Sequence, residues 1–266
     1  MHLNVSRVLG RVFGLGFLLF VAWASFVSHL FGSLQADWAT FLAAILASVV
    51  LHELLHAVAA LLLGARGISI GVWRRGALPL GLYVSIRSEL PLAKWLVVAL
   101  TPLLFSWVVL LLAQPFEWIR GLLIWLSLVN TVGSAGDLTL AIIAAGTGRH
   151  ARVRDVGEAI EIVGGEPSRL SWAFLNASAT LGYALLCSFL VFQILIAIAM
   201  MSGGSIELMG IELVEVVREG NGVTAQTTSS YALISLLSGL VAAAAVAFWS
   251  LKVGQSIYTA ASRNNT

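Results

Sequence analysis

The stretch LHELLHAVAALLLGARG, residues 51–67, places two histidines and a glutamate inside an apolar run that resembles a membrane helix. A charged side chain at the centre of a membrane helix costs about 2.5–3.5 kcal/mol on insertion scales. Polar groups that occupy such positions therefore usually mark a functional site. Whether this run crosses a membrane depends on the rest of the chain.

The composition is that of a polytopic membrane protein. Of the 266 residues, 59% are hydrophobic and 11% are charged, and the mean hydropathy is +0.95. An ordinary soluble domain carries about 25% charged residues. The pI near 9.0 does not indicate a nucleic-acid partner, because membrane helices need basic residues for their orientation. The single cysteine, Cys187, can form no disulfide within the chain.

Six apolar segments are long enough to cross the hydrocarbon core, which takes about 20 residues. They lie near residues 12–31, 38–63, 95–113, 118–146, 172–201 and 230–251. We therefore expect an all-α polytopic membrane protein with six transmembrane helices in a single domain, residues 1–266. Residues 147–171 would form a cytoplasmic loop and residues 202–229 an external loop.

The distribution of basic residues predicts the orientation. Thirteen of the 15 lysines and arginines lie in the N-terminal segment, the loops after the second and fourth helices, and the C-terminal segment. Because positive charge stays cytoplasmic, both termini should be inside. The sequence Ala22-Trp23-Ala24 resembles a signal-peptidase site, but the apolar run continues to Phe31, so we expect an uncleaved first helix.

Two runs after the second helix alternate apolar with smaller or polar residues, which predicts a hairpin with a long loop. Their apolar members are Ile68, Ile70, Val72, Leu82, Val84 and Ile86. The hairpin could be a simple cytoplasmic connector. It could equally hold an extended peptide against an exposed strand edge near the site.

Two other loop segments carry weaker patterns. Residues 149–169 place Val153, Val156, Ile160 and Val163 at helix-like spacing, which predicts a short interfacial helix. On the outer side, residues 211–217 and 223–228 flank a glycine-rich turn and predict a second hairpin.

His52-Glu53-Leu54-Leu55-His56 has the H-E-x-x-H pattern. Histidines four residues apart lie one above the other on a helix, so both imidazoles can reach one zinc ion. Glu53 can then take a proton from the water at the metal. The alternative is a cluster of polar packing residues, which would need several buried partners that the sequence does not offer.

A catalytic zinc needs a third protein ligand and a fourth position for water. Asp137 is the other carboxylate within the apolar segments, and its distance from the cytoplasmic end of its helix matches that of His56. Gly133 and Gly136 allow the fourth helix to approach the second closely or to unwind locally. Asn130, two turns before Asp137, could bind a substrate carbonyl or form an interhelical hydrogen bond.

At these residues the chain resembles site-2 proteases, the intramembrane zinc metalloproteases. It is closer to a family of prokaryotic membrane proteins described as zincin peptidases, which have a comparable HE-x-x-H and a Ser-x-Gly-Asp segment. The resemblance covers residues 38–146, the zinc-site core, and implies zinc on His52, His56 and Asp137, with Glu53 as the base. Unlike site-2 proteases, the chain has Leu138 after the aspartate and no proline shortly before it.

The sequence therefore predicts a zinc metallopeptidase in a prokaryotic cell membrane. Its substrate would be a membrane protein or peptide, cut at a transmembrane or juxtamembrane bond near the cytoplasmic face. Two alternatives are a zinc transporter and a non-catalytic membrane partner that keeps a metal. A transporter would place further ligands at several depths, and a non-catalytic metal site has no use for Glu53. We expect no nucleic-acid partner, and the sequence does not indicate an oligomeric state.

Overall fold

The apolar segments of the sequence fold as long helices. Among the residues that the computed structural model describes, five helices are long and apolar enough to cross a membrane, and a sixth span results if the bent pair α4 and α5 counts as one. The helices are α1 (Leu9–Phe31), α2 (Trp38–Leu62), α3 (Leu92–Leu112), α4 (Arg120–Gly133), α5 (Ala135–Ala145), α6 (Arg169–Ser202) and α7 (Ser229–Arg263), with a short 3-10 helix η2 (Glu117–Ile119) before α4. Length and composition thus agree with the predicted membrane protein.

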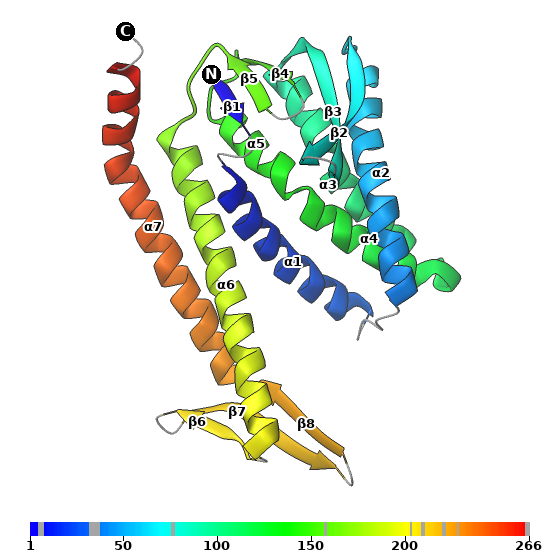
Figure 1. Ribbon diagram of the computed structural model, residues 1–266, viewed down its shortest axis with the longest axis vertical. Helices are drawn as coiled ribbons and strands as arrows, with labels where there is room; N and C mark the ends of the chain where they lie inside the picture. The colour runs from blue at the N-terminus through cyan, green and yellow to red at the C-terminus, as the bar shows by residue number, and fades with distance from the viewer. Residues whose placement is uncertain are drawn as a thin grey trace. The chain divides into compact units, whose positions relative to one another are not determined.

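The structure describes residues 1–4, 8–31, 38–75, 78–156, 159–202, 204–208, 211–219, 222–227 and 229–263. The chain forms two units, Met1–Leu175 and Asn176–Thr266. The first holds α1 to α5 and one sheet, and the second holds most of α6, a second sheet and α7 (Figure 1). The predicted single domain, with its 147–171 and 202–229 loops on opposite sides of the membrane, stays a prediction.

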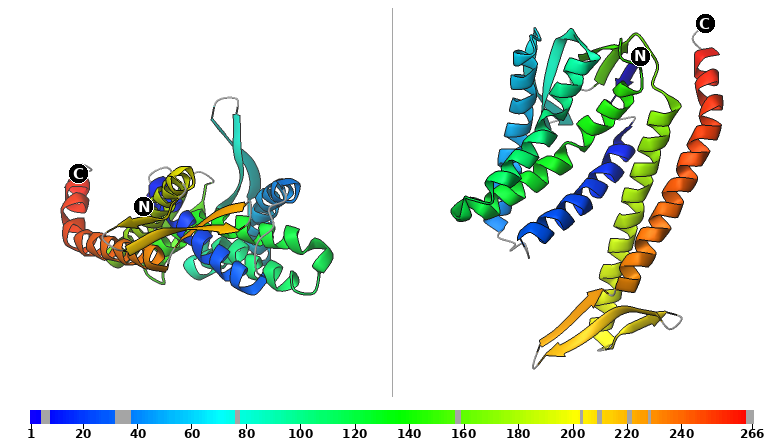
Figure 2. Two further views of the ribbon diagram at one scale, coloured as in Figure 1. Left: turned by 90° about the horizontal axis from the view of Figure 1, so that it is seen from below. Right: turned by 180° about the vertical axis from the view of Figure 1, so that it is seen from behind.

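A five-stranded sheet lies at the end of the first unit where α2 ends and α3 begins (Figure 1). Its strand order is β1-β5-β4-β3-β2. The strands are β1 (His2–Asn4), β2 (Ile68–Arg75), β3 (Leu78–Pro91), β4 (Arg152–Asp155) and β5 (Ala159–Val163), each antiparallel to its neighbours. Figure 2 shows the hairpin of β2 and β3 extending away from the helices of this unit.

The predicted hairpin after the second helix is confirmed, but its predicted long loop is wrong, because the strands continue and Arg75 pairs with Leu78. The apolar residues of its two runs pair directly across the strands: Ile68 with Ile86, Ile70 with Val84, and Val72 with Leu82. Alternation with a period of two places these side chains on one face of the sheet. The end of that face nearest the helices is buried, since Val84 and Ile86 belong to the hydrophobic core.

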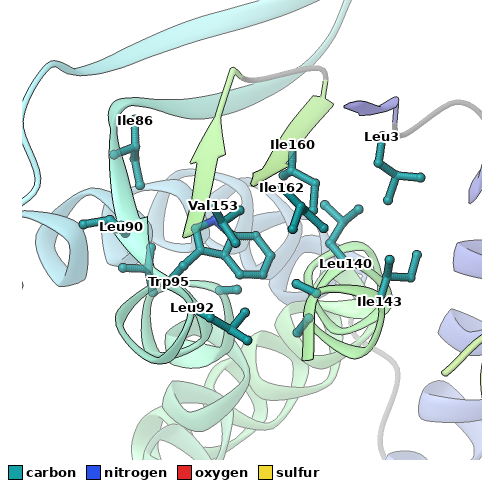
Figure 3. Packing of buried hydrophobic residues seen from close by; sticks show 14 of the residues in the cluster. Leu3, Ile86, Leu90, Leu92, Trp95, Leu140, Ile143, Val153, Ile160 and Ile162 are labelled. Carbon is teal, nitrogen blue, oxygen red and sulfur yellow. The ribbon is translucent and has the colours of Figure 1, made fainter. Parts of the chain in front are cut away.

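The inner face of the sheet packs on α3 and α5 (Figure 3). Trp95 of α3 and Ile143 of α5 meet the buried side chains of four strands. Those strand residues are Leu3, Ile86, Leu90, Val153, Ile160 and Ile162. This packing holds the sheet, which contains the segments predicted to be cytoplasmic, against α3 and α5.

Two predictions about the fold are wrong. The chain is mostly helical but not all-α, because the hairpin belongs to a larger sheet. The segment 149–169 contains β4 and β5 instead of an interfacial helix. Val156 and Val163 are exposed, whereas Ile160 and Ile162 are buried two residues apart, so the helix-like spacing arose from residues of two short strands.

The second unit confirms the predicted hairpin over residues 211–217 and 223–227, while Gly220, Asn221 and Thr228 lie outside the described residues. Strands β6 (Ile206–Leu208), β7 (Ile211–Glu219) and β8 (Gly222–Thr227) form an antiparallel sheet in that order. Within this unit, Asn176 Nδ2 of α6 donates a hydrogen bond to Ser250 Oγ of α7 at 2.9 Å, and Tyr231 Oη donates to the carbonyl of Ser188. Gly239 of α7 lies against Leu181 and Ala184 of α6, which allows close helix packing.

Candidate metal centre

Helix α2 presents its two histidines on one face. His52 and His56 are one helical turn apart, and their ring centroids lie 4.9 Å from one another. Their side chains are only 12% and 11% exposed, respectively. An α-helix brings positions i and i+4 together in this way, so the local geometry follows directly from the HELLH spacing.

A bend between α4 and α5 brings the aspartate to them. The two helices meet at Ser134 with a bend of 41°, and Asp137 lies in the first turn of α5. Backbone hydrogen bonds continue through the bend, from Ser134 N to Asn130 O and from Leu138 N to Ser134 O. A Cβ atom at Gly133 would lie 3.9 Å from His52 Nδ1, so α4 approaches α2 closely here, as the glycine predicted.

Three potential ligand atoms converge at this point. Asp137 Oδ2 lies 2.9 Å from His52 Nε2 and 3.3 Å from His56 Nε2, and the two Nε2 atoms are 3.3 Å apart. Ligands about 2.0–2.2 Å from a tetrahedral zinc ion are separated by about 3.3–3.6 Å. The triangle therefore has nearly the size of one face of a zinc tetrahedron, which leaves the fourth corner for a small molecule.

The hydrogen bonds on the far side of each ring decide which nitrogen carries the proton. His56 Nδ1 lies 2.9 Å from the carbonyl oxygen of Val98 in α3. A carbonyl oxygen can only accept, so Nδ1 is the donor. In the neutral imidazole, His56 Nε2 then carries a lone pair directed at the triangle.

The same reasoning applies to His52 through Asn130. His52 Nδ1 lies 3.0 Å from Asn130 Oδ1. The amide cannot be flipped, because Asn130 Nδ2 donates to the carbonyl of Pro102 at 2.5 Å and to Ser106 Oγ at 2.8 Å. Oδ1 therefore faces the ring, His52 Nδ1 donates to it, and His52 Nε2 also presents a lone pair to the triangle.

When both imidazoles are neutral, two lone pairs and a carboxylate oxygen thus meet at about 3 Å. Such an arrangement is unfavourable unless a cation, either a metal ion or a proton on one of the rings, lies among the three atoms. The donor set of two imidazoles and one carboxylate occurs in catalytic zinc sites. His52, His56 and Asp137 form the one group of three possible metal-ligating side chains close enough to share an ion, among the histidines, cysteines, aspartates and glutamates of the described residues.

Glu53 lies beside the triangle without belonging to it. Its carboxylate is half-buried and close to His52, His56 and Asp137, and it approaches the backbone N–H of Val84 in β3. Glu53, which follows the candidate ligand His52 in α2, therefore lies between the candidate metal centre and strand β3. A carboxylate in this position could exchange a proton with a molecule at the fourth corner.

A chain of buried hydrogen bonds supports the site from behind. Trp23 Nε1 of α1 donates to Ser127 Oγ at 2.9 Å, and Ser127 Oγ donates to the carbonyl of Ser106 at 2.9 Å. Ser106 in turn accepts from Asn130. These bonds join α1, α3 and α4, and they fix the helix that carries Asn130.

The structure brings together His52, Glu53, His56, Asp137 and Asn130, the five residues that the sequence singled out. Asn130 is 1% exposed, and a substrate carbonyl could bind its amide only by breaking one of the bonds described above. Sequence reasoning missed the Val98 carbonyl, because a backbone acceptor has no residue signature. Pro102, four residues later, was the signal that could have found it.

Comparison with known proteins points the same way. Residues 45–151 match a protein family described as "Putative zincin peptidase". A 24.7 kDa protein of Pyrococcus woesei, described as uncharacterized and encoded in the gap 5' region, is 34% identical over 111 residues. That match covers 41% of this chain and 48% of the relative, so the chain spans about half of the relative's length. No solved structure matches. The family match contains all the residues of the candidate metal centre and supports a zincin-like metallopeptidase.

Proposed function

We propose that this protein is an intramembrane zinc metallopeptidase that hydrolyses a peptide bond in a transmembrane or juxtamembrane segment of another protein, near the cytoplasmic face. One observation carries the proposal. Two histidine lone pairs and the Asp137 carboxylate converge at zinc-ligand spacing, and a carboxylate that is not part of the triangle lies beside them. A purely structural metal site has no need of that fourth group.

In this mechanism His52, His56 and Asp137 hold zinc, which when bound supplies Lewis acidity toward water and the scissile carbonyl. Glu53 accepts a proton from the attacking water on its carboxylate and delivers it to the nitrogen of the leaving amine. The bonds from the Nδ1 atoms of His52 and His56 keep both rings in place while this happens. The partly enclosed position of the three ligands limits access by other molecules.

The neighbouring strand suggests how a substrate would be held. In the described residues, β3 pairs with β4 only at Ile86 and beyond, so its edge opposite β2 carries no strand near Val84. Glu53 approaches the backbone N–H of Val84 at this edge. An extended peptide added there would pass beside the metal centre with its carbonyls accessible. A helical substrate must unwind first, because its carbonyls are bonded within the helix.

The cytoplasmic location of the site follows from the basic residues and is part of the proposal. Reporter proteins fused after Arg87 and after Arg154 should read cytoplasmic, and a reporter fused near Asn221 should read external. The reason is that 13 of the 15 basic residues lie in segments that this topology places on the cytoplasmic side, where positive charge stays. An external reading at Arg87 would place the site on the opposite face of the membrane.

The two other functions make different demands on the chain. A zinc transporter would line a path with ligands at several depths, whereas the candidate ligands among the described residues lie in one group. Zinc uptake by proteoliposomes containing the purified protein would favour the transporter. A non-catalytic metal-binding partner would function equally well without the Glu53 carboxylate.

The proposal is tested by comparing the membrane proteomes of cells that express wild type or Glu53→Gln. The amide has nearly the size of the carboxylate but cannot accept the proton, and loss of a general base typically lowers the rate about 10²–10⁴-fold. A substrate should therefore accumulate uncleaved and co-purify with the variant, which should retain its zinc.

Glu89→Gln is the matched control. Glu89 makes an exposed ion pair with Arg152 on the sheet, at 3.2 Å, so the same change of charge occurs away from the metal centre. This variant should cleave like wild type. If Glu53→Gln also cleaved like wild type, Glu53 would not be the base.

A further inference from the structure

Helix α3 contains a proline in its interior, at the level of the metal centre. In an α-helix the N–H of residue i+4 donates to the carbonyl of residue i. Pro102 has no N–H, so the carbonyl of Val98 cannot receive its helical bond. That carbonyl is the one that accepts the hydrogen bond from His56 Nδ1, at 2.9 Å.

The next turn of the same helix supports the other histidine. The carbonyl of Pro102 and the hydroxyl of Ser106 both accept hydrogen bonds from Asn130 Nδ2. Ser106 Oγ donates its own hydrogen toward the Pro102 carbonyl, at 3.4 Å, so its lone pairs are left for Asn130. These contacts are buried and direct Asn130 Oδ1 at His52 Nδ1.

We propose that α3 fixes the metal-binding tautomer and ring orientation of both histidines. Pro102 is the positioning residue for His56, because it leaves the Val98 carbonyl free. Asn130, held by Pro102 and Ser106, is the positioning residue for His52. This inference rests on the proposed metal centre. It assigns to Asn130 the role of orienting the metal ligand His52.

The opposite tautomers would be unfavourable for a local reason. A proton on Nε2 would place the Nδ1 lone pair against the Val98 carbonyl or against Asn130 Oδ1. It would also leave a buried acceptor unsatisfied. The Val98 carbonyl on α3 and Asn130 on α4, which α3 holds in place, therefore keep the Nε2 atoms of His56 and His52 directed at Asp137 before any metal ion binds. Preorganisation of this kind raises metal affinity.

The test uses the full chain purified in detergent and measures zinc affinity by competition with a chelator of known affinity. In Pro102→Ala, the new N–H would draw the Val98 carbonyl back into the helical ladder. In Asn130→Ala, His52 would lose its acceptor. Each variant should bind zinc about 10–100-fold more weakly than wild type, the effect that loss of such outer partners typically has.

Two neighbouring substitutions serve as controls. Thr101→Val removes a side-chain bond to the carbonyl of Val97, one residue from Val98. Thr131→Val removes a buried bond to the carbonyl of Ser127, one residue from Asn130. Neither bond touches a histidine, so both controls should keep the zinc affinity of wild type.

Two further readings separate positioning from general damage. Because alanine favours a helix interior over proline, metal-free Pro102→Ala should unfold at the same temperature as wild type or higher. The visible spectrum of the cobalt-loaded protein should change in Pro102→Ala and Asn130→Ala but not in the controls, since it reports the geometry of the ligands.

Wild-type zinc affinity and an unchanged cobalt spectrum in both Pro102→Ala and Asn130→Ala would overturn the inference. Loss of affinity in Asn130→Ala accompanied by an equal loss in Thr131→Val would do the same for Asn130. Failure of the proposed metal centre is distinguishable, because wild type itself would then bind no zinc.

Discussion

The apolar helices of the two units differ in the kinds of polar side chain that they contain. Residues 176–202 and 229–251, the apolar parts of α6 and α7, contain no charged residue and no histidine. Two of their hydrogen bonds, from Asn176 to Ser250 and from Tyr231 to the carbonyl of Ser188, join one helix to the other. In the first unit, α2 and α5 carry two histidines and two carboxylates, and these groups face one another.

This difference distinguishes polar residues that stabilise helix packing from ionisable residues that form a functional site. Single hydrogen bonds between membrane helices stabilise association modestly, about 0.6 kcal/mol on average. Ionisable groups cost far more to bury and are retained where a function requires them. The family match, residues 45–151, also lies within the first unit. Substitutions in the two units should therefore differ in what they change, namely metal binding in the first and stability in the second.

The largest effect is expected at Asp137. Asp137→Ala removes one of three metal ligands, so purified protein should lose its zinc, about one ion per chain, as completely as His56→Ala does. Zinc is measured by elemental analysis after dialysis against a weak chelator.

Asp155→Ala is the control, since Asp155 lies in β4 and is not among the candidate ligands. It should keep full zinc. An Asp137→Ala protein with full zinc occupancy would mean that another group completes the site.

A graded effect is expected at Gly133, where α4 meets α2. Gly133→Ala places a Cβ atom 3.9 Å from His52 Nδ1, an ordinary contact, and should leave zinc affinity unchanged. Gly133→Leu adds atoms that must displace the His52 ring, so zinc affinity should fall about 10–100-fold. Equal affinities in the two variants would show that the close approach of α4 does not position His52.

The smallest effect is expected in the second unit. Asn176→Ala removes the 2.9 Å bond to Ser250 and should lower the free energy of unfolding by about 0.6 kcal/mol, without changing zinc affinity. Detergent unfolding and chelator competition measure the two quantities on the same sample. A loss of zinc from Asn176→Ala would break the separation between the units.

Much of the candidate site could be predicted from the sequence, because ionisable residues are costly to bury in apolar helices and are therefore rare there. His52, Glu53, His56 and Asp137 stand out in apolar runs, and helical spacing alone brings the two histidines together. Their convergence with Asp137 also requires the 41° bend at Ser134, for which the flanking glycines gave only a general indication. The alternation of residues 68–86 likewise predicted the hairpin, although not how far its two strands extend toward the turn.

The rest of the sheet could not be predicted, because its strands are short and their pairing is non-local. Strand β1 has three residues and pairs with β5, more than 150 positions away. A run of three to five residues contains too few periods to distinguish a strand from a helix. The Val98 carbonyl was hidden for another reason, since its availability depends on the proline four residues later.

The central claim, a zinc centre built from α2 and α5, is tested most directly by X-ray absorption spectroscopy of the zinc-loaded wild-type protein. The spectrum should show two imidazole nitrogens at about 2.0–2.1 Å from zinc and one carboxylate oxygen at about 2.0–2.2 Å, with a further light ligand from solvent. In His52→Ala, one of the two imidazole signals should be lost. A first shell without imidazole, or one containing the Cys187 sulfur, would contradict the account.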